Sequence, residues 1–144
     1  MISTAEKLHV KKVTDQAILP TRAHADDAGL DLYAFEPGVI KAGEGLVART
    51  GIAMALPPGT VGLVADRSSM AKKGVKTSGG VIDAGYRGEI HIVLRNITHQ
   101  DITFDRGERI AQLLILPILT PAVVEVHSLD ETSRGEKGFG STGK

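Results

Sequence analysis

The stretch Ile52-Ala-Met-Ala-Leu-Pro-Pro-Gly-Thr-Val-Gly-Leu-Val-Ala65 predicts two β-strands joined by a tight turn. Ile52, Met54 and Leu56 alternate with small residues, and this period of two places their side chains on one face of a strand. Pro57-Pro58-Gly59 then marks a turn, after which the apolar run resumes. We therefore expect a β-hairpin in this part of the chain.

Other short apolar runs repeat this pattern along the chain. Ile90, Ile92 and Leu94 alternate with polar residues, which predicts a half-buried strand. Residues 110–116 are apolar almost throughout, so we expect a strand buried on both faces, and residues 123–126 predict another strand. No long segment has the spacing of an amphipathic helix. These features predict an all-β sandwich or jelly roll rather than a parallel sheet.

Two segments depart from the strand pattern. Ser68 or Ser69 is placed to cap a short helix over residues 70–73, and Gly74 is placed to end it in the left-handed conformation. Residues 134–144 are glycine-rich and polar and lack the periodicity of a core-forming element. We therefore expect at most one short helix, and a flexible C-terminal arm (134–144) after a core domain (1–133).

Composition narrows the classes of protein that fit. Lysine plus arginine and aspartate plus glutamate number 17 each in 144 residues, so no net field favours nucleic acid or an anionic membrane. The absence of cysteine excludes disulfides and cysteine nucleophiles, and the five histidines are too scattered for a zinc site. No signal peptide and no apolar stretch of roughly 20 residues is present. We expect one cytoplasmic domain with neither nucleic acid nor membrane as a partner.

Several residues have two plausible roles on sequence grounds. A helix that starts with Arg67, Ser68 and Ser69 has two interpretations. These residues form either a compact anion site or an ordinary helix cap beside a solvated arginine. Asp83 at a glycine-marked turn is a candidate general base or only caps the turn, and Asp31 belongs to an acidic loop that could simply be solvated. The arm contains an arginine, a phenylalanine and a Ser-Thr pair. They could clamp a phosphate and stack on a ring, or the arm could simply be a solubilising end.

Five segments in this order carry a more specific signal. They are Asp27-Ala-Gly-Leu-Asp31-Leu, Arg67-Ser-Ser-Met-Ala, Gly80-Val-Ile-Asp-Ala-Gly-Tyr-Arg-Gly88, Gly107-Glu-Arg-Ile-Ala-Gln112 and residues 134–143. Together they resemble the five motifs of the trimeric dUTPase family. The resemblance implies a jelly-roll-like distorted barrel and a homotrimer with active sites shared between subunits. It also implies Mg²⁺-dependent hydrolysis of dUTP to dUMP and pyrophosphate by attack of water on the α-phosphorus. This reaction controls dUTP levels and supplies dUMP for thymidylate synthesis.

The resemblance assigns catalysis and recognition of the nucleoside to the third motif. Asp83 would orient and deprotonate the attacking water. Tyr86 would pack beneath the deoxyribose and leave no room for a 2′-hydroxyl. Uracil would be read by the backbone of Gly80, Val81 and Ile82. Many bacterial relatives add an asparagine side chain where this chain has Thr77, so we expect a mainly backbone readout and leave the part of Thr77 open.

The remaining motifs would hold the phosphates. By the same resemblance, Asp31 would hold water bound to Mg²⁺ rather than the metal itself. The arm would close over a neighbouring subunit's site, with a stacking ring on uracil and an arginine and two hydroxyls at the γ-phosphate. The expected phosphate contacts of the body are Arg67, Ser68, Ser69 and Gln112, and the expected contacts of the arm are Arg134, Phe139, Gly140, Ser141 and Thr142.

Two other functions are compatible with the same fold. A dCTP deaminase shares the jelly roll and the trimer, but it uses a glutamate on the strand after the third motif, where this chain has Val93. A non-catalytic nucleotide-binding regulatory module would need neither Asp83 nor the arm. Asp66 stands where the dUTPase family often has proline or glycine, and Lys137 where it often has glycine.

Overall fold

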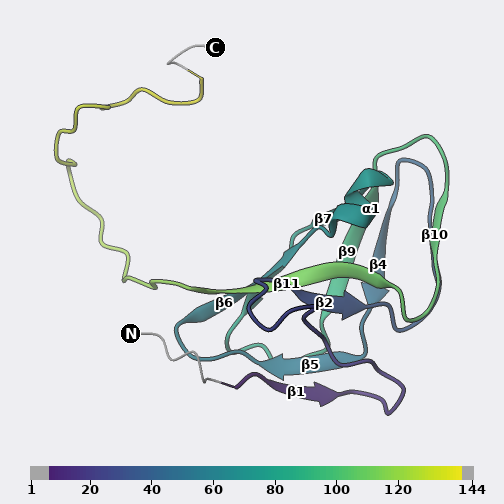
Figure 1. Cartoon of the computed structure of the whole chain (residues 1–144). Helices are drawn as coiled ribbons and strands as arrows, with labels where there is room; N and C mark the ends of the chain where they lie inside the picture. Colours follow the sequence, from purple (N-terminus) through teal and green to yellow (C-terminus); the bar gives the residue numbers. More distant parts are fainter. Residues whose placement is uncertain (1–6, 141–144) are drawn as a thin grey trace.

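The computed structural model describes residues 7–140, in which eleven strands and one short helix confirm the all-β prediction (Figure 1). The elements in chain order are β1 (His9–Lys12), β2 (Leu30–Tyr33), β3 (Gly38–Ile40), β4 (Gly45–Arg49), β5 (Ile52–Ala55), β6 (Thr60–Ala65), α1 (Ser68–Lys72), β7 (Val75–Ser78), β8 (Val81–Asp83), β9 (His91–Asn96), β10 (Ile102–Phe104) and β11 (Arg109–Pro117).

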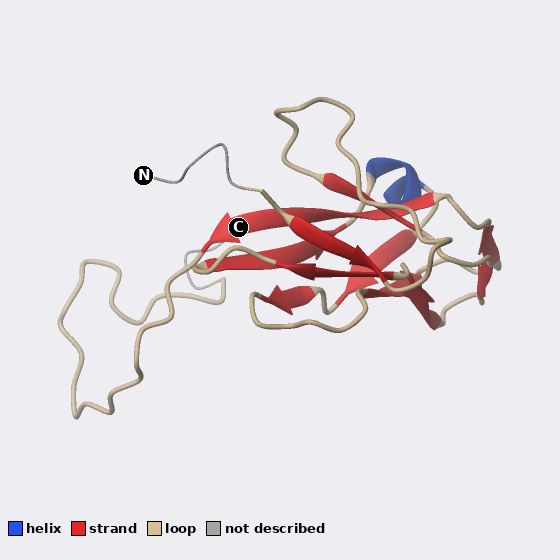
Figure 2. Cartoon of the chain, turned by 90° about the horizontal axis from the view of Figure 1, so that it is seen from below, coloured by secondary structure: helices blue, strands red, loops and turns tan. Residues whose placement is uncertain are grey.

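The strands form antiparallel sheets whose neighbours are mostly distant in sequence. The largest sheet has the strand order β2-β11-β6-β8, and a second sheet has the order β4-β9-β7. The pairs β1-β5 and β10-β3 complete the body. Figure 2 shows the strands stacked in layers with α1 at one edge. Such nonlocal antiparallel pairing is typical of a jelly roll.

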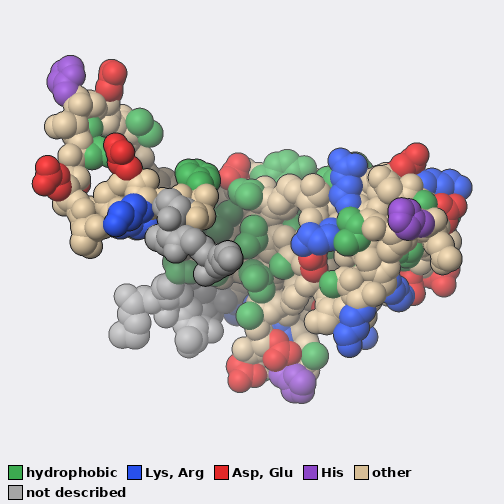
Figure 3. Space-filling model, turned by 90° about the horizontal axis from the view of Figure 1, so that it is seen from above, with side chains coloured by type: hydrophobic (Ala, Val, Ile, Leu, Met, Phe, Trp, Pro, Cys, Tyr) green, Lys and Arg blue, Asp and Glu red, His purple; other side chains and the backbone are tan. Residues whose placement is uncertain are grey.

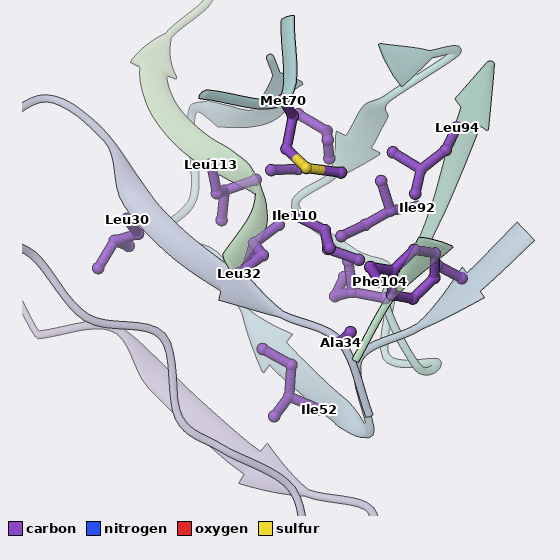
Figure 4. Close-up of a cluster of buried hydrophobic side chains, with 14 of the residues drawn as sticks. Leu30, Leu32, Ala34, Ile52, Met70, Ile92, Leu94, Phe104, Ile110 and Leu113 are labelled. Atoms are coloured by element: carbon purple, nitrogen blue, oxygen red, sulfur yellow. The ribbon is translucent and has the colours of Figure 1, made fainter. Parts of the chain in front are cut away.

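The core lies between these layers. Leu32, Ile92, Leu94, Ile110 and Leu113 come from three strands and are at most 1% exposed. In Figure 4 their side chains converge on Met70, which is the one buried residue of α1. Burying a side chain of this size stabilises the fold by about 1.5–3 kcal/mol. The short helix is therefore held in place by its methionine rather than by its own hydrogen bonds.

The predicted hairpin around the Pro57-Pro58-Gly59 turn is wrong, although both of its strands form. β5 pairs with β1, whereas β6 pairs with β11 and β8. Neither proline can donate a hydrogen bond to a ladder that would close the hairpin. The turn instead carries the chain from one sheet to the next.

Two further strand predictions need correction at the C-terminal end. In β11, Ile110 and Leu113 are fully buried, but Leu116 is 41% exposed, because β2 pairs with β11 only as far as Leu113. Residues 123–126 form no strand, since no other strand of the described chain lies beside them and their valines are exposed. After Pro117 the described chain extends away from the body (Figures 1 and 2).

Candidate active site

A cleft of about 910 Å³ collects the residues that were predicted to hold phosphates. Gln112 on β11 pairs with Asp31 on β2 and with Ala65 on β6, so three adjacent strands bring the first, second and fourth motifs together. Four cationic side chains line this cleft, namely Arg67, Lys72, Lys73 and Arg109, and the other predicted residues in its wall are Asp31, Ser68, Ser69 and Gln112. We call this the cationic cleft. Its charge suits a polyphosphate.

An ion-pair network holds the two arginines of the cleft over Asp31. Arg67 Nε donates to Asp31 Oδ1 at 3.0 Å, and Arg109 Nη1 lies 3.6 Å from Asp31 Oδ2. Arg67 Nη1 also donates to Ser69 Oγ at 3.2 Å and to the Arg109 carbonyl at 3.1 Å. Arg109 was not among the residues predicted from the sequence, although it stands inside the fourth motif. Its place on the outward face of β11 could have revealed it.

The start of α1 differs from its prediction. Arg67, not a serine, is the N-cap residue, and no side chain caps the helix. The N–H groups of Met70 and Ala71 donate to the Arg67 carbonyl, whereas those of Ser68 and Ser69 precede the first helical hydrogen bonds at the wall of the cleft. Gly74 ends the helix at φ +91°, as predicted.

Asp66 ties the cationic cleft to β7. Its carboxylate accepts hydrogen bonds at 2.7 Å from Lys76 Nζ and from both the N–H and the hydroxyl of Thr77. Its carbonyl accepts from Gln112 Nε2, also at 2.7 Å. Partial burial alone raises the pKa of Asp66, but the bonds from Lys76 and Thr77 outweigh burial and lower the pKa below its ordinary value. The hydroxyl of Thr77 is thus committed to Asp66.

The carboxylates of the cationic cleft suit a Mg²⁺ ion only if the ion arrives already bound to a polyphosphate. Among residues 7–140, no group of three or more His, Cys, Asp or Glu side chains could hold a metal ion by itself. Asp31 is already paired with Arg67 and Arg109. Mg²⁺ keeps most of its waters and takes phosphate oxygens readily, so this donor set fits an ion that arrives with a polyphosphate.

A second, separate cleft of about 200 Å³ lies along β8 and contains Val81, Ile82, Asp83 and Tyr86. β8 pairs with β6 on one side and is an edge strand of its sheet on the other. Backbone groups on the free edge of such a strand remain available to a ligand. Gly80, at φ +91°, turns the chain into β8 and gives its carbonyl to the Val64 N–H. The Asp83 side chain is exposed.

Tyr86 is held beside Asp83 by a tight turn. Its N–H donates to the Asp83 carbonyl at 3.1 Å, and its hydroxyl donates to the Glu89 carbonyl at 2.9 Å. Arg87 Nη1 closes the turn by donating to the carbonyls of Ala84 and Tyr86. The ring remains 45% exposed and forms part of the wall of the second cleft.

The predicted arm residues lie far along the C-terminal segment. Arg134 Nε donates to the Lys137 carbonyl at 2.8 Å, and the Phe139 side chain is fully exposed. Phe139 and Gly140 both have positive φ, of 50° and 84°. Ser141 and Thr142 lie outside the described residues. Figure 1 shows this segment directed away from the body.

Comparison with known proteins supplies the family. The dUTPase family model matches residues 15–143. A deoxyuridine 5′-triphosphate nucleotidohydrolase of Clostridium acetobutylicum is 49% identical over 139 residues, covering 94% of this chain and 96% of that protein. The structure of the Staphylococcus bacteriophage 80alpha dUTPase with dUpNHpp is 33% identical, with a TM-score of 0.90 over 97% of this chain and 100% of that one.

A third relative bears on the metal. A single-residue mutant of the dUTPase from phage phi11 of S. aureus is 29% identical, with a TM-score of 0.79 over 85% of this chain and 98% of that one. Its structure reveals the coordination of a structural Mg(II) ion. The order of the five motifs, the two clefts that they build and the match over nearly the whole length lead to one conclusion: this chain belongs to the dUTPase family.

Proposed function

We propose that this protein hydrolyses dUTP to dUMP and pyrophosphate, and that it does so as a homotrimer whose active sites are shared between subunits. The observation that carries the proposal is the position of the two clefts on β6. Asp83 pairs with Val61 at the start of β6, whereas Arg67 follows the end of the same strand. A strand rises by about 3.3 Å per residue, so these two residues lie about 20 Å apart.

That separation is too large for one substrate in one chain. A general base must lie within hydrogen-bond reach of the water that it activates, directly or through one further water. If Arg67 binds the α- and β-phosphates, the attacking water lies within a few ångströms of those phosphates. Asp83 of a second subunit therefore completes the cationic cleft of the first.

The exposed apolar surface supports association. Val47, Val81 and Ile97 are 58%, 65% and 70% exposed. Figure 3 shows a band of hydrophobic side chains on the body beside the root of the C-terminal segment. Apolar side chains gathered in such a band are typical of surfaces that bind another protein, here a second copy.

In this proposal each half-site has its own task. The phosphates are bound by Arg67, Ser68, Ser69 and Gln112, and we add Arg109 because it lines the same cleft. Asp83 takes a proton from water as the water attacks the α-phosphorus and the bond to the bridging oxygen breaks, releasing pyrophosphate. Asp31 would hold a water of a Mg²⁺ ion that arrives with the triphosphate, and such an ion would supply charge neutralisation and alignment of the phosphates.

Base and sugar are selected along β8. The free edge of β8 offers backbone N–H and C=O groups to uracil, and Tyr86 crowds the sugar from below. Because the hydroxyl of Thr77 is bonded to Asp66, we assign the reading of uracil to the backbone after Gly80. The arm of residues 134–144 closes the site after the core of residues 1–133, with Arg134, Ser141 and Thr142 at the γ-phosphate and Phe139 and Gly140 over the uracil.

This chain lacks the glutamate that a dCTP deaminase would need. Val93 occupies β9 opposite Val47 and Ser78, so that position has no carboxylate for deamination. No helix among the described residues is long and apolar enough to cross a membrane. We place the reaction in the cytoplasm, because its substrate belongs to the intracellular nucleotide pool.

Two experiments test this function. Purified protein with Mg²⁺ should release pyrophosphate from dUTP and far less from UTP, dTTP or dCTP, with no ammonia from dCTP. No pyrophosphate from dUTP would refute the activity and leave a binding module as the function.

The second experiment tests the shared site. Arg67→Ala and Asp83→Asn subunits should each be nearly inactive alone. Co-expressed as mixed trimers verified by native mass spectrometry, they should regain activity, because some sites then combine an intact Arg67 with an intact Asp83. Absence of recovery in verified mixtures would mean that both residues act within one chain.

A further inference from the structure

The structure assigns a positioning role to Glu89 and Arg49: we propose that this ion pair fixes the ring of Tyr86 and thereby sets the discrimination between deoxyribose and ribose. The inference rests on the proposed function of Tyr86 and names the residues through which that function is maintained. Glu89 lies in the wall of the second cleft beside Tyr86, and in this scheme the pair affects the sugar only through the Tyr86 ring. Both act through the backbone carbonyl that receives the Tyr86 hydroxyl.

The Glu89 carboxylate is bound from several directions. Arg49 donates to both of its oxygens, with Nε 3.0 Å from Oε2 and Nη2 2.9 Å from Oε1. The Gly51 N–H and His91 Nε2 both lie 3.3 Å from Oε2. Only 13% of the Glu89 side chain is exposed. A bidentate arginine–carboxylate pair of this kind fixes orientation as well as distance.

The surroundings keep the pair ionised and rigid. The guanidinium of Arg49 lies 4.8 Å from the centroid of the Phe35 ring, which packs against its face. The hydrogen bond from Arg49 lowers the pKa of Glu89 and outweighs the opposite effect of burial. Glu89 thus remains a carboxylate at neutral pH, anchored to the end of β4.

The residues before and after Glu89 also hold its carbonyl and the Tyr86 ring in place. Ile90, the next residue, donates its N–H to the Ile52 carbonyl at 2.8 Å and accepts the Thr50 hydroxyl at 2.6 Å. The Glu89 carbonyl therefore has a fixed place from which to accept the Tyr86 hydroxyl. On the other side, a Cβ at Gly88 would collide with the phenol, so the ring lies directly against the chain there.

A steric filter needs this support. The Tyr86 ring is 45% exposed, so packing alone leaves it free to change rotamer. A ring that swings away admits the 2′-hydroxyl that it should exclude. Loss of the hydrogen bond from the Tyr86 hydroxyl to the Glu89 carbonyl should therefore raise turnover of UTP relative to dUTP. A purely structural defect would instead lower turnover of both substrates.

The test compares kcat/KM for dUTP and for UTP in the full-length protein. Glu89→Gln weakens the ion pair with Arg49, and Tyr86→Phe removes the hydroxyl that binds the Glu89 carbonyl. Each should lower the dUTP to UTP ratio by about two- to tenfold. The double variant should lower it no further than the stronger single variant, since both act through one bond. Asp101→Asn, at the exposed Lys41–Asp101 pair elsewhere on the body, is the matched control and should leave the ratio unchanged.

Each outcome decides between the alternatives. An unchanged ratio in folded Glu89→Gln, or additive effects in the double variant, would overturn the role of the ion pair. If Glu89→Gln fails to fold by circular dichroism, Arg49→Lys and Gly88→Ala replace it. Arg49→Lys removes the bidentate contact and Gly88→Ala displaces the ring directly, and an unchanged ratio in both would overturn the inference.

Tyr86→Ala separates this inference from the function beneath it. A lowered ratio in Tyr86→Ala with an unchanged ratio in Glu89→Gln would refute only the positioning role. An unchanged ratio in Tyr86→Ala would remove sugar selection from Tyr86, and a wild-type protein that leaves dUTP intact would refute the proposed activity. The inference falls with either of these last two results.

Discussion

Replacing Asp66 with alanine should cost about 2–4 kcal/mol of stability, most of it through Thr77. The substitution removes the acceptor of two hydrogen bonds from Thr77 and one from Lys76. A buried donor left without a partner costs about 1–3 kcal/mol, and the partial burial of Thr77 places its two donors toward the lower part of that range. Lys76 is 58% exposed and should add less than about 1 kcal/mol.

Asp101→Ala is the matched control for this prediction. Asp101 also accepts from a lysine and from a backbone N–H, Lys41 and Ala42, but its side chain is 48% exposed. Its loss should therefore cost clearly less stability than the loss of Asp66, because water screens an exposed pair and can replace its hydrogen bonds. Urea unfolding at one fixed protein concentration measures the free energy of unfolding of both variants. In thermal unfolding, the melting temperature of Asp66→Ala should fall by roughly 5–15 °C. Equal losses in the two variants, or a loss below about 0.5 kcal/mol in Asp66→Ala, would refute the reasoning.

The same variant carries a pH test. The pKa of Asp66 is lower in the folded protein than its ordinary value, so its contribution is complete at neutral pH. It is lost as the pH falls below about 4, through the folded pKa. The stability gap between wild type and Asp66→Ala should therefore narrow in acid. A gap that stays constant down to the acid transition would mean that the Asp66 charge is not what stabilises this contact.

Three further predictions concern turnover. Asp83→Asn should lower kcat by about 10²- to 10⁴-fold while dUTP still binds in calorimetry, and near-wild-type turnover would remove Asp83 as the base. A chain ending at Ser133 should melt close to wild type yet hydrolyse dUTP very slowly, because residues 134–140 add little buried surface; a large loss of melting temperature would contradict this. Phe139→Ala should weaken binding by about 1–3 kcal/mol, a smaller defect than truncation; an equal defect would leave no separate role for the arm's phosphate contacts.

The sequence predicted what depends on local pattern or on motif identity. The alternation of Ile90, Ile92 and Leu94 predicted the buried face of β9 and of the residue just before it, because a period of two holds whichever strand lies alongside. The predicted residues of the cationic cleft do line one cleft, because their motifs lie on or directly after adjacent strands. Whether each binds phosphate stays a prediction.

Pairing and side-chain partners were not predictable in the same way. β5 and β6 flank a tight turn yet belong to different sheets, and that outcome depends on β1, β8 and β11 rather than on the turn. The valines of residues 123–126 suit a strand, but a strand also needs a neighbour. The bond from Arg49 to Glu89 spans 40 residues, and nothing in the local sequence marks it.

β6 links the two halves of the proposed site and also keeps them apart within one chain. Asp66 secures the cationic cleft just beyond the end of this strand, and Glu89 secures Tyr86 near its start, where Asp83 pairs with Val61. Each half is thus rigid within its own subunit, so association has only to bring two finished surfaces together. This arrangement reduces the ordering cost that a site assembled from mobile parts would incur at each turnover. It also means that a defect in one half leaves the other competent, so subunits damaged in opposite halves should complement each other.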